Sequence, residues 1–243
     1  MTVCVFLGPS MPRSEAEALL PGVYLGPARR GDIAAAIKAH NPSAIALIDG
    51  YFEQVPAVWH KEILWALAQG IRVAGAASMG ALRAAELAQF GMEGVGRIFE
   101  SFQTGRFDPF EDPFEDDDEV AVVHGPAETG YAATEAMVDI RATLASAADT
   151  GVIDLPARDR LAAKAKALFY KQRIWPAVLE GETERALLED WLPSGLVPQK
   201  RLDAEALLCH VATSPAPPFR PFRFEQTVLW ERMGPGPRVE EVP

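Results

Sequence analysis

The sequence GIRVAGAASMGALRAAELAQFG (residues 70–91) carries the clearest structural pattern in this chain. The apolar run at 71–77 predicts a strand, and the residues from Met79 to Phe90 predict a helix that ends at Gly91. A strand that passes directly into a helix is the repeating unit of α/β proteins. This stretch therefore predicts an α/β fold with a strand-to-helix turn at residues 76–80.

The residues before this stretch repeat the same alternation. Apolar runs predict strands at 3–7, 23–25 and 43–49, with a further strand at 119–124. Amphipathic segments predict helices at 13–20, 32–40 and 56–69. Strands and helices that alternate at this spacing predict a mainly parallel sheet flanked by helices in the N-terminal half.

The pattern becomes helical after about residue 128. Helices are predicted at 131–148, 156–172, 184–192 and 204–211, and Asp154 and Asp203 stand where N-caps belong. We expect an α/β domain at 1–125 that carries the site, a helical region at 126–212 packed on it, and a Pro-rich extension at 213–243. The aromatic segment 219–230 of this extension is expected to dock on the body or on a partner, and its end, from residue 234, is expected to be disordered.

Net charge, apolar run length and cysteine content exclude several classes of protein function. The 243 residues carry a formal net charge of −11, which argues against a nucleic-acid binder or a protein of anionic membrane surfaces, because both need a basic face. No apolar run is long enough to cross a bilayer, and the N-terminus does not resemble a signal peptide. Cys4 and Cys209 form no zinc or disulfide pattern, which fits a reducing cytoplasm. We expect neither a metal nor a cofactor.

Most of the negative charge lies in one segment, DPFEDPFEDDDE (108–119). It holds eight carboxylates and no base, and without them the net charge of −11 would be −3. Its spacing does not match a calcium-binding EF-hand loop. We expect a solvated loop or a partner-docking surface, with Asp116, Asp117 and Asp118 as the partner-binding residues.

Polar or glycine-rich segments follow four of the predicted strands. They are Gly8-Pro9-Ser10, Asp49-Gly50, the 76–80 turn and His124-Gly125. In open parallel sheets, ligands bind beyond the carboxyl ends of the strands. The sequence therefore predicts a site at this edge of the sheet.

Ser78 is the candidate nucleophile within that site. It lies where the strand turns into the helix, between Ala77 and Met79, in a pattern close to the nucleophile elbow G-x-S-x-G with Ala76 replacing the first glycine. Small neighbours permit a tight turn, and N–H groups at the start of the helix could hold an oxyanion. The alternative is that Ser78 only caps the helix, since serine is a favoured N-cap residue.

Lys61 is the candidate base on the 56–69 helix. Its helical neighbours are Val58, Leu64 and Trp65, so it lies in an apolar patch where a neutral amine is favoured. A lysine whose stem covers the patch while its amine stays in water is the alternative. His60 and His124 are competing bases, and either Asp49 or Glu86 could orient His124.

The first 124 residues resemble the TfuA-like proteins. The resemblance rests on GPS (8–10), ALIDGYFEQVPAVWHKEIL (46–64), GIRVAGAASMGALRAAELAQFGMEGVG (70–96) and DDDEVAVVH (116–124). The short AASMG piece also resembles the serine segment of Clp-type proteases.

Membership in this family implies a function in peptide backbone thioamidation beside a YcaO enzyme, which activates the amide of a precursor peptide with ATP. The TfuA-like partner would hydrolyse the C-terminal thiocarboxylate of a ThiS-like sulfur carrier, release sulfide, and help the YcaO engage its peptide. The family's Ser–Lys pair maps by motif onto Ser78 and Lys61. N–H groups near Met79, helped by the Gly8–Ser10 loop, would hold the oxyanion.

Three hypotheses follow. The first is this Ser–Lys thiocarboxylate hydrolase. The second is an adaptor without catalysis that tethers the sulfur donor to YcaO through the acidic segment and the tail. The third is a Ser–His hydrolase of peptides or esters that uses His124.

Overall fold

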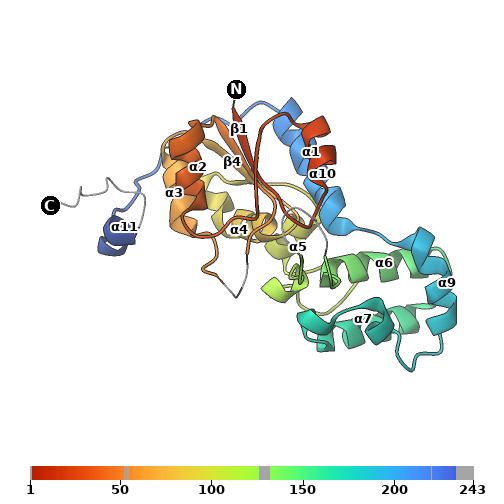
Figure 1. The fold of residues 1–243 in the computed structure, drawn as a ribbon. Helices are drawn as coiled ribbons and strands as arrows, with labels where there is room; N and C mark the ends of the chain where they lie inside the picture. The colour runs from red at the N-terminus through yellow and green to blue at the C-terminus, as the bar shows by residue number, and fades with distance from the viewer. Residues whose placement is uncertain (1, 52, 54, 126–131, 220, 234–243) are drawn as a thin grey trace.

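The computed structural model describes residues 2–233 except 52, 54, 126–131 and 220 (Figure 1). Its centre is a five-stranded parallel sheet in the order β2-β1-β3-β4-β5. The strands are β1 (Val3–Phe6), β2 (Val23–Leu25), β3 (Ala44–Leu47), β4 (Arg72–Gly75) and β5 (Glu93–Gly94). The predicted α/β class with a mainly parallel sheet is therefore confirmed.

Helices cover both faces of the sheet because successive side chains of each strand point to opposite faces. Val5, Ala46 and Ala74 pack toward α1 (Arg13–Leu19) and α10 (Gln199–Thr213). Phe6, Ile45 and Val73 pack toward α2 (Asp32–His40), α3 (His60–Ala68) and α4 (Met79–Leu87). Figure 1 shows α1 and α10 together on one side of the sheet and α2 and α3 on the other.

The helical half has its own apolar core. It is formed by α5 (Arg97–Thr104), α6 (Met137–Asp149), α7 (Leu155–Ala167), α8 (Trp175–Val178) and α9 (Arg185–Gly195), and Leu144, Leu161 and Leu188 are fully buried in it. From α9 the chain returns to the sheet as α10, whose Ala204, Leu207 and Leu208 complete one of the two sheet faces. The predicted helical C-terminal half is confirmed, and its last long helix is part of the α/β layer.

The two predicted N-caps have different outcomes. Asp154 caps α7, where its carboxylate accepts a hydrogen bond of 2.8 Å from the Ala157 N–H. The prediction for Asp203 is wrong, because α10 begins four residues earlier, at Gln199, and Asp203 lies inside it. Its carboxylate instead accepts the Ile98 N–H at 2.8 Å, in the first turn of α5. Asp203 thus serves a helix that lies far from it in the sequence.

The strand predicted at 119–124 is absent. Asp117–Glu119 form a short 3-10 turn, η2, and 120–123 are irregular. The strand that pairs with β4 on the side away from β3 is β5, where Gly75 is paired with Gly94. The Val-rich run at 120–123 therefore has another use, which is to form part of the wall of a cavity.

The aromatic segment of the tail docks on the body of the protein. Trp230, in α11 (Val228–Met233), lies 6.1 Å from the Trp65 ring of α3, and Phe222 lies 5.8 Å from Phe90. The apolar patch predicted around Trp65 is therefore covered by this chain's own tail. The prediction for 234–243 lies outside the described residues, and the domain boundary predicted at 125/126 lies at the start of 126–131, which are also outside them. No helix in the described part of the chain combines the length and the apolar character that crossing a membrane requires.

Candidate functional site

A cavity of about 780 Å³ opens at the carboxyl ends of the strands. Its lining includes Pro9 after β1, Asp49 and Gly50 after β3, and Ser78 after β4. The sheet order 2-1-3-4-5 reverses direction between β1 and β3, and ligands bind at such a switch point in doubly wound folds. The cavity therefore lies where the topology predicts a binding site.

The turn that carries Ser78 has an unusual backbone. The Ser78 N–H donates to the Ala76 carbonyl at 2.8 Å, which closes a three-residue turn, and Ala77 at its centre has φ +66°. A residue with a Cβ in this left-handed region costs about 1–2 kcal/mol. Such strain is found most often at functional sites, where the surrounding structure maintains it.

Close packing of α4 on the strand ends maintains this turn. A Cβ at Gly80 would lie 1.8 Å from the Leu47 carbonyl oxygen, so only glycine fits at this position. The Gly80 N–H donates to the Ile48 carbonyl at 3.1 Å, which joins the first turn of α4 to the end of β3. The glycine of the AASMG segment thus has a structural role, and it holds the backbone around Ser78 in place.

The Ser78 side chain is buried, with 4% of its surface exposed, and it lines the cavity. Ser78 occupies the N-cap position of α4, as the alternative prediction required, but its side chain makes no capping hydrogen bond. Its hydroxyl has no hydrogen-bond partner among the described residues, and neither has the backbone N–H of Met79. A free hydroxyl beside a free N–H at a helix start is the arrangement that nucleophile and oxyanion donor need.

Asp49 links the first two predicted segments of the site. This carboxylate is 2% exposed, and it accepts the Gly8 N–H at 2.8 Å, the Ser10 N–H at 3.1 Å and the Ser10 hydroxyl at 2.7 Å. Asp49 thereby fixes the loop after β1 against the end of β3. The N–H groups of Gly8 and Ser10, which were expected to help hold an oxyanion, point to Asp49 in this structure.

His124 lines the same cavity as Ser78. Its Nδ1 lies 2.8 Å from the Gly125 carbonyl oxygen, and its ring centre lies 5.8 Å from that of Tyr51. The two carboxylates that were expected to orient it have other partners. Asp49 is engaged by the loop after β1, and Glu86 pairs with His60 and Arg83.

Lys61 is not among the residues that line the cavity. Its amine donates a hydrogen bond to the Glu225 carbonyl and lies 4.6 Å from the centre of the Phe224 ring. No hydrogen bond joins Lys61 to Ser78 in the structure, so the expected direct contact of the pair is not formed. The tail covers the face of α3 from which Lys61 projects.

A different lysine, Lys200, lines the cavity, although it is not among the site residues predicted from the sequence. Lys200 is 4% exposed, its Nζ donates to the Val120 carbonyl at 3.0 Å, and its backbone N–H donates to Asp139 at 2.9 Å. Burial raises the pKa of Asp139 to about 6. The sequence does contain a signal that could have identified Lys200. If α10 begins at Gln199, then Lys200, Ala204 and Leu208 recur at four-residue intervals, which places Lys200 on the buried face of the helix.

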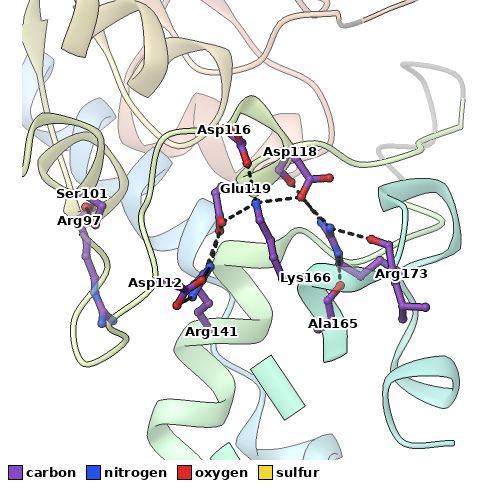
Figure 2. A network of polar contacts seen from close by, with 11 residues as sticks. Arg97, Ser101, Asp112, Asp116, Asp118, Glu119, Arg141, Ala165, Lys166 and Arg173 are labelled. Carbon is purple, nitrogen blue, oxygen red and sulfur yellow. Dashed lines mark hydrogen bonds and ion pairs between the residues drawn. The ribbon is translucent and has the colours of Figure 1, made fainter. Parts of the chain in front are cut away.

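Four of the eight carboxylates of the acidic segment pair with basic residues of the helical half (Figure 2), namely Asp112, Asp116, Asp118 and Glu119. Arg141 bonds to both Asp112 and Glu119, and its guanidinium lowers the pKa of Asp112. Lys166 and Arg173 supply two further cations from the helical half. Lys166 lies 3.4 Å from Asp116, 3.1 Å from Asp118 and 2.8 Å from Glu119, and Arg173 lies 2.8 Å from Asp118.

This network, formed by residues 112–119 with Arg141, Lys166 and Arg173, fixes much of the segment that was expected to be a solvated or docking loop. Of the three residues predicted to bind a partner, Asp118 is held on two sides by Lys166 and Arg173. Asp116 is 70% exposed despite its contact with Lys166, and Asp117 is exposed. The described residues contain no group of three or more His, Cys, Asp or Glu side chains arranged to hold a metal ion.

The chain matches the model of a known protein family. The model of the family described as TfuA-like protein matches residues 49–174, a range that contains Asp49, Lys61, Ser78 and His124. Lys200 lies outside the matched range. No curated protein matches the chain.

Proposed function

The chain belongs to the TfuA-like family, and on that basis we propose that it works beside a YcaO enzyme in peptide backbone thioamidation. In this proposal it hydrolyses the C-terminal thiocarboxylate of a ThiS-like sulfur carrier, releases sulfide, and helps the YcaO engage its precursor peptide. The observation that carries the proposal is the buried Ser78 hydroxyl, which faces a cavity at the switch point without a partner among the described residues.

The proposed reaction has two steps. In the first, Ser78 Oγ forms a bond to the terminal carbonyl carbon, the C–S bond breaks, and the sulfur leaves as hydrosulfide with the proton that the hydroxyl has lost. The Met79 N–H holds the negative oxygen of the tetrahedral intermediate. In the second step, water hydrolyses the ester, which regenerates Ser78 and leaves the carrier with an ordinary carboxylate.

Lys61 keeps its predicted role as the proton acceptor in this proposal. For that role its amine has to exchange the Glu225 carbonyl and the Phe224 ring for the Ser78 hydroxyl. Residues 215–233 would then have to move away from α3 during turnover. This requirement makes the assignment of Lys61 open to a separate test.

The location of His124 favours a second candidate, a Ser–His hydrolase of peptides or esters. His124 and Ser78 line one cavity, whereas Lys61 does not. Loss of activity in His124→Ala together with retained activity in Lys61→Ala would support this candidate. The opposite result would support the Ser–Lys pair.

The principal test uses the full-length protein and a thiocarboxylated ThiS-like carrier. Sulfide is measured colorimetrically, and the conversion of thiocarboxylate to carboxylate is followed by mass spectrometry of the carrier. Ser78→Ala is expected to lower the rate by at least about a thousandfold, because the nucleophile is removed. The exposed Ser14→Ala variant is the control and should keep the wild-type rate. Undiminished sulfide release in Ser78→Ala would remove Ser78 as the nucleophile.

A further inference from the structure

Lys200 and Ser78 line the same cavity. Lys200 lies on the sheet-facing side of α10, one helical turn before Ala204, and Ala204 packs in the same core cluster as Ala76 and Ala77. The opposite end of α10 lies near the start of β4, where Arg72 donates to the Val211 carbonyl. The first turn of α10 is therefore at the carboxyl end of the strands, where Lys200 lines the cavity and its amine bonds to the Val120 carbonyl.

The Lys200 amine has few partners for so buried a group. An ammonium group has three N–H donors, and a single hydrogen bond, to the Val120 carbonyl, is formed within the described residues. No described carboxylate lies within 4.0 Å of its Nζ, and the nearby Asp139 accepts the backbone N–H of Lys200. Lys166, by contrast, contacts three carboxylates.

Asp139 is near enough to interact electrostatically with Lys200, but its carboxylate bonds to the backbone N–H and not to the amine. A buried ammonium group with no carboxylate in direct contact among the described residues is poorly compensated, and an anion that enters the cavity would lower that penalty. The start of α4 adds to the same effect, because the N-terminus of a helix attracts negative charge. Ser78, itself more than nine-tenths buried and without a described partner, lines the cavity at this helix start. The Lys200 amine, the N-terminus of α4 and the Ser78 hydroxyl are together suited to bind an anion whose carbonyl carbon is attacked by the hydroxyl.

We propose that Lys200 binds the anionic end of the substrate, a terminal thiocarboxylate or carboxylate of a polypeptide. This inference rests on the proposed function for the identity of the substrate. It gives Lys200 the role of binding the anionic group, whereas Lys61 and His124 are candidates for the proton acceptor. A thiocarboxylate carries a negative charge that disfavours attack by an oxygen nucleophile. An ammonium group beside the sulfur offsets this charge and makes the carbonyl carbon easier to attack.

The test measures binding of a small carboxylate that cannot react. N-acetylglycine and its neutral amide, N-acetylglycinamide, are titrated by calorimetry into the full-length wild type and into Lys200→Met. The matched control is Lys164→Met, which removes a lysine that pairs with Glu182 outside the cavity. Wild type and Lys164→Met are expected to prefer the carboxylate, and Lys200→Met is expected to bind it at least tenfold more weakly while its affinity for the amide is unchanged. Lys200→Arg, which keeps the charge, should retain part of the preference.

A second measurement separates this inference from the proposed function. Lys200→Met is expected to raise the KM for sulfide release from the thiocarboxylated carrier more than it lowers kcat. Sulfide release that is absent in wild type, together with carboxylate binding that depends on Lys200, would end the proposed function and leave the anion site in place.

Three results would overturn the inference. The first is an equal preference for carboxylate over amide in wild type and Lys200→Met. The second is no binding of N-acetylglycine to wild type. The third is loss of the folded circular dichroism spectrum in both Lys200→Met and Lys200→Gln, which would assign Lys200 a structural role.

Discussion

The network around Arg141 and the cavity around Ser78 both bury polar groups, but the network pairs its charged groups, whereas the cavity leaves several of its polar groups without a partner among the described residues. In the network, Glu119 and Arg141 are almost fully buried, and each has charged partners at hydrogen-bond distance. In the cavity, the Ser78 hydroxyl and the Met79 N–H have no partner among the described residues, and Lys200 has one. Buried groups that satisfy each other stabilise a fold, whereas those left unsatisfied are available to a ligand. This difference makes Ser78, Met79 and Lys200 the candidates in the cavity for contact with a ligand, and assigns Glu119 and Arg141 to the stability of the fold.

Arg141→Met is expected to lower the free energy of unfolding more than a change at Asp139 or the removal of the tail. It leaves Glu119 and Asp112 without their shared cation, and breaking a buried pair costs about 3–5 kcal/mol. The free energy of unfolding, measured by urea denaturation, should fall by about this amount. The control Arg185→Met removes an exposed pair with Glu189 and should cost less than about 1 kcal/mol.

The same variant tests the functional side of the comparison. Sulfide release per folded molecule should stay within about twofold of wild type, because Arg141 does not line the cavity. A loss of activity at unchanged stability would place the network in the functional site and would contradict the distinction drawn above.

The pH dependence of stability should show the effect of Asp139. Burial raises the pKa of Asp139 from its ordinary value of 3.8 to about 6 in the folded protein. The folded state therefore holds a proton that the unfolded state has already released, so the free energy of unfolding falls as pH rises from about 4 to about 6. This one group contributes a loss of about 2–3 kcal/mol over that window.

Asp139→Asn should remove this part of the pH dependence, because the amide does not titrate and can still accept the Lys200 N–H. The measurement is urea denaturation at several pH values between 4 and 7. Asp149→Asn, at an exposed position of the same helix, is the control and should leave the slope unchanged. An unaltered slope in Asp139→Asn would show that Asp139 titrates normally.

Removal of residues 215–243 should have the smallest effect on stability and a direct bearing on Lys61. The truncation frees the Lys61 amine and exposes Trp65, which together should cost about 1–3 kcal/mol in the free energy of unfolding. If Lys61 is the proton acceptor, the rate of sulfide release should rise several-fold, because the tail no longer occupies its amine. An unchanged rate, or one that Lys61→Ala does not lower, would exclude Lys61 from the reaction.

Local patterns in the sequence predicted the sheet and the position of Ser78. Apolar runs and helical spacing are properties of neighbouring residues, so the strand-to-helix turn at 76–80 could be located without a structure. Asp49 could be placed at the same edge because it follows a strand. The predictions that were wrong concern contacts between residues that are far apart in the chain. Asp203 resembles an N-cap in the sequence, but it serves α5, about a hundred residues earlier, and this error hid the helical face on which Lys200 lies.

The acidic segment shows the same limit. Its eight carboxylates have no base among them, so the sequence predicts a solvated or docking loop. Arg141, Lys166 and Arg173 come from later parts of the chain, and only the fold brings them to Asp112, Asp118 and Glu119. The apolar patch around Trp65 was predicted correctly, but nothing in its spacing indicated that Trp230 would cover it.

The return of α10 to the sheet has a practical consequence for dissecting this protein. A fragment that ends near residue 125 would contain every strand and Ser78, but it would lack Ala204, Leu207 and Leu208. The part of one sheet face over β3 and β4, where α10 packs and α1 does not replace it, with Ala46 and Ala74 on it, would then meet water, and such a fragment should aggregate when expressed alone. Expression trials and tagging should therefore keep the chain intact through at least Thr213, where α10 ends.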